Sequence, residues 1–324
     1  MRPILEIDNL AVSFQGGRKP AVRGLSLSLA EGEIVGLVGE SGSGKSLSAL
    51  SVMGLLPPAA AFDGGSIIFR GEEMTTLYPD RRRELCGAHL GMVFQEPLTA
   101  LNPVLTIGEQ LAEIYRLRQG RSRREARQKA VEMLARVGLS NPAQAADSYP
   151  HRFSGGMRQR VVIAIALALS PELIIADEPT TALDPTIAAQ ILRLLSQLVE
   201  ENNSAVLFIT HNLHLLKGLA SRVLVMYTGL ALEEAPVPEV FEKPAHPYTQ
   251  GLLKALPPSL DLPAPERLTA IEGAPPVPGQ WPAGCPFQPR CEKAFAPCSE
   301  SLPPLYELDG GRKVRCFLYA GEQC

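Results

Sequence analysis

Residues 34–46 read Ile-Val-Gly-Leu-Val-Gly-Glu-Ser-Gly-Ser-Gly-Lys-Ser, an apolar run followed by the pattern G-x-x-x-x-G-K-S. In this phosphate-loop pattern a strand leads through a glycine-rich turn into a helix. The glycines let backbone N–H groups converge on phosphate oxygens, and the dipole of the following helix attracts the same anion. The segment therefore predicts an α/β fold that binds a nucleoside triphosphate.

Two side chains at the end of this loop carry its chemistry. Lys45 supplies a positive charge near the β- and γ-phosphates, and the Ser46 hydroxyl is suited to hold Mg²⁺. The whole predicted phosphate-binding segment is Gly39, Glu40, Ser41, Gly42, Ser43, Gly44, Lys45 and Ser46.

A second pattern, Phe-Ser-Gly-Gly-Met-Arg-Gln-Arg at residues 153–160, selects one class of nucleotide-binding protein. S-G-G-x-x-Q is the signature of ATP-binding cassettes, and Leu-Ile-Ile-Ala-Asp-Glu-Pro follows it at residues 173–179. Up to about residue 255 the chain resembles the ATP-binding subunit of an ABC transporter. The resemblance implies an α/β phosphate-loop cassette with a RecA-like core, an antiparallel β subdomain and a helical insert at about residues 96–160.

The resemblance also implies roles for residues outside the loop. Asp177 is expected to hold Mg²⁺, and Glu178 to act as general base toward the attacking water. His211, at the end of an apolar run, matches the switch histidine that contacts the γ-phosphate. Phe14, which replaces a more frequent tyrosine, is expected to stack on adenine, and Gln95 is expected to ligate Mg²⁺.

In the family arrangement the signature and the phosphate loop lie on opposite edges of one cassette. Two cassettes are therefore expected to face each other head to tail, with ATP between them. Asp184 followed by Pro185 also reads as an N-cap and first-turn proline, so we expect Asp184 to serve both roles. The residues expected to act on the partner's nucleotide are Ser154, Gly155, Gly156, Gln159 and Asp184.

The remaining pattern alternates helices and strands, which predicts a parallel sheet covered on both faces. A capping-box pair, Ser122 and Glu125, opens one helix, and Gly138 closes it. The predicted strands cover residues 4–14, 22–38, 173–177, 204–210 and 222–227, and the predicted helices cover 46–56, 107–118 and 122–137.

Composition narrows the partners and the location. The 324 residues carry a net charge of −3, so nucleic acid is not expected as the main partner. The longest apolar run has nine residues, far below the ~20 that span a bilayer. No secretory pattern is visible at the N-terminus, and we expect a peripheral subunit on the cytoplasmic face of the cell inner membrane.

The last part of the chain points to a subfamily. His-Pro-Tyr-Thr-Gln-Gly-Leu-Leu at residues 246–253, together with a proline-rich tail, is similar to the oligopeptide/dipeptide branch of ABC importers, including relatives that carry nickel. The proline-rich composition predicts an irregular extension at residues 256–324, after a cassette at residues 1–255. The branch implies a second, homologous cassette as heterodimer partner, two membrane permeases and an extracytoplasmic binding protein.

Four of the six cysteines cluster in this tail. Disulfides are not expected to persist in a cytosolic protein, and gathered thiolates suit a soft metal or an iron–sulfur cluster. Members of the branch are thought to hold a 4Fe-4S cluster, whereas zinc commonly uses tighter C-x2-C pairs. Zinc and free thiols remain open alternatives. The four cysteines are Cys285, Cys291, Cys298 and Cys316.

The sequence thus predicts an ATP-hydrolysing subunit that powers import of di- or oligopeptides through separate permeases. The same role in import of nickel or another small solute is one alternative. A soluble ABC ATPase acting on nucleic acid or ribosomes is another, although the chain has one cassette and no strongly basic surface. A regulatory cassette without turnover is the third, and the presence of Glu178 and His211 argues against it.

Overall fold

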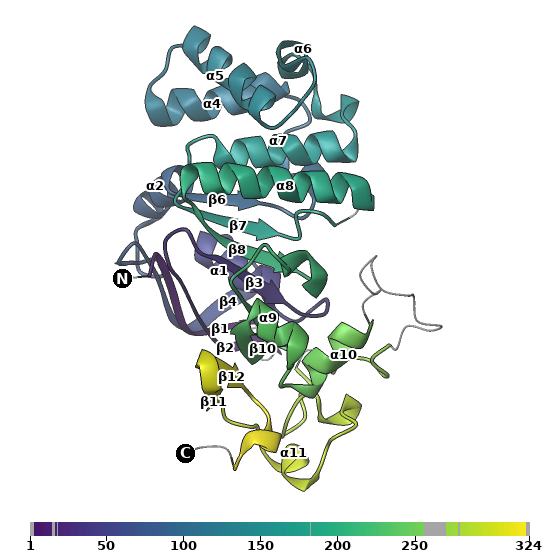
Figure 1. Ribbon diagram of the computed structural model, residues 1–324. Helices are drawn as coiled ribbons and strands as arrows, with labels where there is room; N and C mark the ends of the chain where they lie inside the picture. Colours follow the sequence, from purple (N-terminus) through teal and green to yellow (C-terminus); the bar gives the residue numbers. More distant parts are fainter. Residues whose placement is uncertain are drawn as a thin grey trace. The chain divides into compact units, whose positions relative to one another are not determined.

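The protein is described here by a computed structural model (Figure 1), which divides into two compact units. Unit 1 contains residues 1–4, 29–33 and 76–208, and unit 2 contains residues 5–28, 34–75 and 209–324. Ala182, the start of the predicted extension and Cys324 lie outside the described residues. The described residues are 3–14, 17, 19–181, 183–255, 270–277 and 279–321.

The strands of unit 1 are short and fully buried. β6 (Leu90–Val93) pairs in parallel with β7 (Leu173–Asp177), and β7 lies between β6 and β8 (Ala205–Thr210), whose last two residues belong to unit 2. Apolar and β-branched residues favour strands that are covered on both faces. The predicted parallel pairing is confirmed here, and Asp177 stands at the carboxyl end of β7.

Helices make up most of the remainder of unit 1. Figure 1 shows α4 and α5 side by side, and α7 running along α8. Together α4, α5 and α6 form the helical insert that the sequence predicts. The helices are α2 (Pro79–Ala88), α3 (Pro97–Ala100), α4 (Ile107–Gln119), α5 (Arg123–Arg136), α6 (Pro142–Ala146), α7 (Gly155–Leu167) and α8 (Pro185–Asn202).

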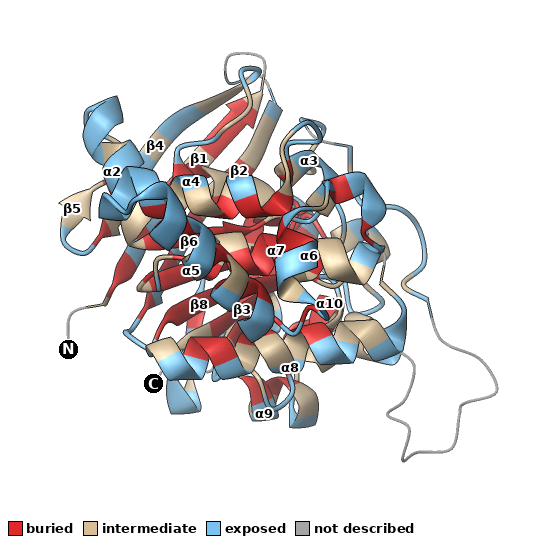
Figure 2. Cartoon of the chain, turned by 90° about the horizontal axis from the view of Figure 1, so that it is seen from above, coloured by how far each residue is buried: buried red, intermediate tan, exposed pale blue. Residues whose placement is uncertain are grey.

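Local sequence sets the ends of these helices. The predicted capping box is present at the start of α5, where the Ser122 hydroxyl accepts from the Glu125 N–H and the Glu125 carboxylate accepts from the Ser122 N–H. Gly138, just after α5, has a left-handed backbone with φ of 74°. Helix α8 buries Ile191 and Leu195, one turn apart, while its outer face is exposed (Figure 2).

Unit 2 contains two sheets. In the first, β1 (Leu5–Phe14) pairs antiparallel with β4 (Ala60–Phe69), which confirms the expected antiparallel subdomain. In the second, β3 (Ile34–Val38) runs parallel to β9 (Arg222–Tyr227), and the strand order is β11-β12-β10-β9-β3. The other strands are β2 (Lys19–Leu29), β5 (Glu72–Glu73), β10 (Leu230–Pro236), β11 (Tyr306–Leu308) and β12 (Arg312–Val314).

The helix after the phosphate loop is shorter than predicted. Helix α1 (Lys45–Met53) ends at Gly54, before the two prolines that the sequence analysis used as its stop. Gly54 adopts a left-handed backbone with φ of 68°, and its N–H bonds back into the last turn. The other helices of this unit are α9 (Val237–Glu242), α10 (Pro247–Ala255) and α11 (Ala296–Glu300).

The C-terminal extension is more regular than predicted near its end. Strand β12 pairs antiparallel with β10, and β11 pairs with β12. Val314 of β12 is fully buried, and it packs with Ala245, Tyr306 and Cys316. Among the described residues, no helix has both the length and the apolar character needed to cross a membrane.

Candidate functional site

Glycine is required at several positions of the phosphate loop. Gly42 and Gly44 have φ angles of 78° and 100°, a left-handed region in which side chains are strained. A Cβ on Gly39 would lie 2.2 Å from the carbonyl oxygen of Met226, which closes the loop against strand β9. The backbone is therefore shaped as a tight concave turn, which is the form that surrounds a phosphate.

Lys45 lies at the centre of this turn. Its side chain is 4% exposed, and Nζ donates to the carbonyl oxygens of Gly39 at 2.8 Å and Glu40 at 3.0 Å. The half-buried Ser46 follows in the first turn of α1, whose N-terminus adds a positive dipole end. The loop thus concentrates positive potential where the sequence predicts phosphate.

Glu40 is held in place by residues that the sequence analysis did not single out as contacts. The backbone N–H of Glu40 donates to the Tyr248 hydroxyl at 3.0 Å. The Glu40 carboxylate accepts from Arg290 Nη1 at 2.9 Å. Tyr248 belongs to the 246–253 segment that indicated the peptide branch, whereas no sequence signal marks Arg290, 250 residues away from Glu40.

The acidic pair stands where β7 ends, within unit 1. Asp177 is 5% exposed, and Glu178 adopts a left-handed backbone with φ of 45°, which is uncommon for a residue other than glycine. The Glu178 Oε2 accepts from Thr181 Oγ1 at 2.7 Å and from Gln95 Nε2 at 3.3 Å. The structure therefore brings two predicted site residues, Gln95 and Glu178, into direct contact.

The signature segment opens helix α7. Ser154 is the N-cap, and its hydroxyl accepts from the Met157 N–H at 3.3 Å. Ser154 and Gly155 are exposed, as a contact across a dimer would require. Gln159 differs, because its side chain is 2% exposed and faces the interior. A buried side chain is poorly placed to reach a partner's nucleotide, so the burial of Gln159 gives no support to its predicted contact across the dimer.

The signature packs directly against the start of α8. A Cβ on Gly156 would lie 2.6 Å from Ile187 Cγ2, whereas one on Gly155 would lie 3.6 Å from Leu183, an ordinary contact. Asp184 is exposed and caps α8, since its Oδ1 accepts from the Ile187 N–H at 3.0 Å. The predicted N-cap is confirmed, and the exposed ends of the two motifs are neighbours.

Two other predicted residues lie in unit 2. Phe14 is half-buried at the end of β1, opposite Ala60 of β4. His211 is exposed and directly follows β8. Ser46 and Lys45 belong to this unit as well, while Gln95, Asp177 and Glu178 belong to unit 1.

The four clustered cysteines of the extension line one small cavity. Cys285, Cys298 and Cys316 are buried, and Cys291 is half-buried. Burial and, to a lesser extent, the other three sulfurs raise the pKa of Cys285 to about 11. Within the described residues, no three His, Cys, Asp or Glu side chains form a group that could hold a metal ion. The structure gathers these cysteines, but the predicted iron–sulfur cluster stays a prediction.

Comparison with known proteins identifies the family. The profile of the ABC transporter family matches residues 22–181, and that of the oligopeptide/dipeptide transporter C-terminal region matches residues 232–298. The oligopeptide transport ATP-binding protein AppD of Bacillus subtilis is 47% identical over 325 residues, which cover 99% of this chain and 98% of that protein. The chain belongs to the ABC transporter family of ATP-binding proteins.

Other similar proteins agree with this assignment. A putative peptide import ATP-binding protein of Brucella abortus is 48% identical over 316 residues, 97% of this chain and 94% of that protein. The dimeric ATP-binding cassette MJ0796, solved with ADP and Pi in a post-hydrolysis state, has a TM-score of 0.65 and 29% identity. That match covers 72% of this chain and 98% of the cassette. This ABC protein is thus a phosphate-loop ATPase whose nucleotide is ATP with Mg²⁺.

Proposed function

We propose that this ABC ATPase powers the import of di- or oligopeptides across the cytoplasmic membrane through separate permease subunits. The observation that carries the proposal is the presence, in one chain, of a cassette and an oligopeptide/dipeptide transporter C-terminal region. AppD and the Brucella relatives, which are named for peptide transport, match over nearly the whole chain. We assign residues 1–255 to the cassette and residues 256–324 to the extension.

Glu178 is the general base in this proposal. Its carboxylate accepts two hydrogen bonds at one oxygen, from Thr181 and Gln95, which hold it in one orientation. The Glu178 carboxylate is the group that would take the proton of the attacking water. A fixed carboxylate costs little reorganisation when the water is activated, and the left-handed backbone at Glu178 contributes to the same orientation.

ATP is bound by the loop and by residues around it. The concave backbone, which glycine at Gly39, Gly42 and Gly44 makes possible, fits a phosphate chain with Lys45 at its centre. Mg²⁺, when bound, neutralises charge on the β- and γ-phosphates. Its ligands in this proposal are Ser46, Gln95 and Asp177. Phe14 offers an aromatic face to adenine, and His211 contacts the γ-phosphate.

A second, homologous cassette completes the nucleotide site. Ser154, Gly155 and Asp184 are exposed at neighbouring helix starts, which suits contact with ATP held by the partner. ATP then stabilises the closed pair, and hydrolysis releases it. The motion is passed through Gln95 and the helical insert to two membrane permeases, with an extracytoplasmic binding protein delivering the peptide. The chain itself would lie at the cytoplasmic face of the inner membrane.

The cysteine cavity is proposed to hold a 4Fe-4S cluster. The support is that the four clustered cysteines line it although as many as 31 positions separate them in the sequence, from Cys285 to Cys316. Burial raises the pKa values of Cys285, Cys291 and Cys316, and neighbouring sulfurs add to the rise. A bound cation would offset this and favour the thiolate form that ligates iron. The cluster would stabilise the extension. Zinc or free thiols remain the outcomes that would replace it.

Transport assays test the main proposal. Cells that express this chain with its permeases and binding protein are given labelled dipeptide, a longer peptide or nickel. Peptide uptake is expected, and Glu178→Gln is expected to abolish it. Glu201→Gln is the matched control, since Glu201 is a surface carboxylate of the same unit that bonds to Arg136.

The outcomes separate the alternatives. Nickel uptake without peptide uptake would keep the ATPase role and overturn the peptide assignment. If no solute depends on Glu178 while purified chain still hydrolyses ATP, the transport proposal is wrong and the non-transport ATPase takes its place.

A further inference from the structure

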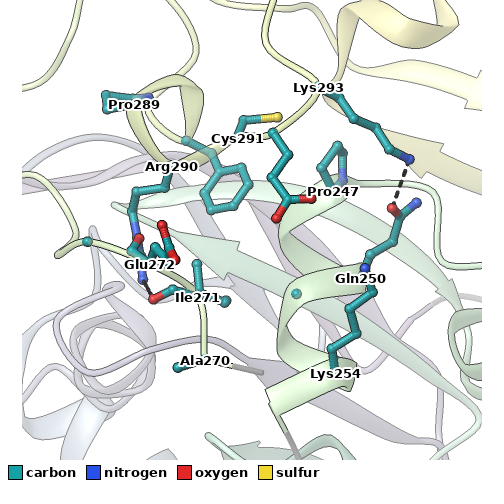
Figure 3. A pocket seen from close by; sticks show the side chains of 14 residues that line it. Pro247, Gln250, Lys254, Ala270, Ile271, Glu272, Pro289, Arg290, Cys291 and Lys293 are labelled. Carbon is teal, nitrogen blue, oxygen red and sulfur yellow. Dashed lines mark hydrogen bonds between the residues drawn. The ribbon is translucent and has the colours of Figure 1, made fainter. Parts of the chain in front are cut away.

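Arg290 of the extension is fixed by contacts on several sides. Nη1 donates to Glu40 Oε2 at 2.9 Å and to the Tyr227 hydroxyl at 3.2 Å, and Nη2 lies 3.3 Å from Glu40 Oε1. Nε donates to the carbonyl oxygen of Glu272 at 3.0 Å, and Figure 3 shows Arg290 beside Glu272. The side chain is 6% exposed. Its planar fork is therefore held in one orientation, facing a single carboxylate.

Aromatic rings support the same orientation. The guanidinium carbon lies 5.8 Å from the ring centroid of Tyr227 and 6.0 Å from that of Phe287, distances at which a cation is attracted to a ring. The Tyr227 and Phe287 rings meet edge to face with centroids 5.5 Å apart. These ring contacts restrain Arg290, so its guanidinium would not move with Glu40 if the loop changed position.

Glu40 is a negative charge within a loop that binds an anion. It lies between Gly39 and Ser41, and its side chain is 25% exposed. A carboxylate this close to bound phosphates would repel them, since like charges in a partly buried site interact strongly. The Glu40 backbone is itself part of the loop and is bonded to Tyr248, so the residue cannot leave. The carboxylate must instead be neutralised where it is.

We propose that Arg290 is a positioning residue for ATP binding, which neutralises Glu40 and turns its carboxylate away from the phosphates. The C-terminal extension is then part of the machinery of the nucleotide site and not only an appendage. Arg290 does not touch ATP in this proposal. It acts through Glu40. If Arg290 were removed, the negative charge of Glu40 would be left without its neutralising partner.

The test compares ATP affinity among variants of the full-length chain. Mg-ATP binding is measured by equilibrium dialysis with labelled nucleotide. Arg290→Ala is expected to weaken ATP binding about tenfold, because the carboxylate is left unpaired beside the phosphates. Adding Glu40→Gln to Arg290→Ala is expected to restore affinity to within about twofold of the wild type, because the repelling charge is gone.

Two features distinguish this role from a merely structural one. The loss in Arg290→Ala is expected to shrink at high salt, since salt screens a partly exposed charge. Glu40→Gln alone is expected to bind ATP more tightly than Arg290→Ala does, because it removes the charge that Arg290→Ala leaves unpaired. Arg312→Ala is the matched control, because Arg312 forms a half-buried ion pair with Glu239 in the same unit, outside the phosphate loop.

Three results would overturn the proposal. The first is unchanged affinity in Arg290→Ala, and the second is an equal loss in the double variant. The third is a loss in Glu40→Gln alone as large as that in Arg290→Ala. If Arg290→Ala fails to fold, Glu40→Gln and Arg290→Lys decide. Arg290→Lys keeps the charge and is expected to retain most of the affinity, and a tenfold loss there would contradict the charge argument.

Discussion

The amide of Gln95 donates to the Glu178 carboxylate at 3.3 Å, joining two residues that are 83 positions apart. Gln95 follows β6 and Glu178 follows β7, and these strands are parallel neighbours. Because carboxyl ends of parallel strands meet at one edge of a sheet, the two side chains converge there. A residue expected to ligate Mg²⁺ thus touches the residue expected to activate water.

Replacement of Glu178 by Gln is expected to lower kcat for ATP hydrolysis about 10²- to 10⁴-fold, the usual contribution of a general base. ATP affinity is expected to stay close to wild type, because Gln keeps the shape of the side chain and the Thr181 contact. Phosphate release and ATP binding are measured on the same preparation. Glu201→Gln controls for loss of a surface carboxylate. Hydrolysis that survives Glu178→Gln would assign the base elsewhere.

Gln95→Ala is expected to lower kcat about tenfold with little change in ATP affinity, because the orienting bond to Glu178 is lost. The sharper measurement is a double-mutant cycle. In a Glu178→Gln background, Gln95→Ala should cause little further loss, since residues that act as a unit are not additive. Losses that multiply would show that Gln95 acts independently of Glu178.

Adjacent glycines of the signature are expected to respond differently to alanine. Gly156→Ala would place a Cβ 2.6 Å from Ile187 Cγ2, and we expect a loss of about 1–3 kcal/mol in the free energy of unfolding. Gly155→Ala meets Leu183 at an ordinary 3.6 Å and should cost far less. Denaturant titration compares the two.

The cause of the Gly156 effect is checked by relief of the overlap. Ile187→Leu removes the offending Cγ2 methyl, so it should recover part of the stability lost in Gly156→Ala. Equal destabilisation by alanine at both glycines would mean that helix packing does not set this requirement.

Asp184 is expected to have separable capping and catalytic roles. Asp184→Asn keeps a side-chain oxygen for the Ile187 N–H and should leave stability nearly unchanged, whereas Asp184→Ala should cost about 1 kcal/mol. Lower ATPase activity in Asp184→Asn, measured beside thermal unfolding, would reveal a role for the charge across the dimer. If both variants lose only stability, the capping role is sufficient.

Iron reconstitution tests the cysteine cavity. Without metal, Cys291 should be alkylated before Cys285, Cys298 and Cys316, because it is half-buried and also lines a hollow of about 610 Å³. The rate should rise with pH, since the pKa of Cys291 is raised mainly by burial. Iron and sulfide should protect all four thiols but not Cys86, which lies outside the cavity.

Other results for the cavity have equally clear meanings. Protection by zinc, with no iron–sulfur absorbance after anaerobic reconstitution, would replace the cluster by a zinc site. Alkylation rates that neither metal changes would leave the four cysteines as free thiols.

The sequence determined the elements whose causes are local. A glycine-rich turn between an apolar strand and a helix has one common use, so residues 39–46 predicted the phosphate loop. The capping box at Ser122 and the N-cap at Asp184 could be read from a few neighbouring residues, and both are present. The end of α1 was misplaced, because a left-handed glycine stops a helix as well as a proline does.

Tertiary structure alone decided the contacts between distant segments. The residues near Arg290 and Tyr248 in the sequence do not predict a bond to Glu40. Glu40 lies 250 positions from Arg290 and 208 positions from Tyr248. Local sequence likewise does not predict that Gly156 packs against Ile187, or that β11 and β12 extend the sheet beside β10. Such contacts follow from packing of whole elements, whereas turns, caps and strand ends follow from short-range stereochemistry.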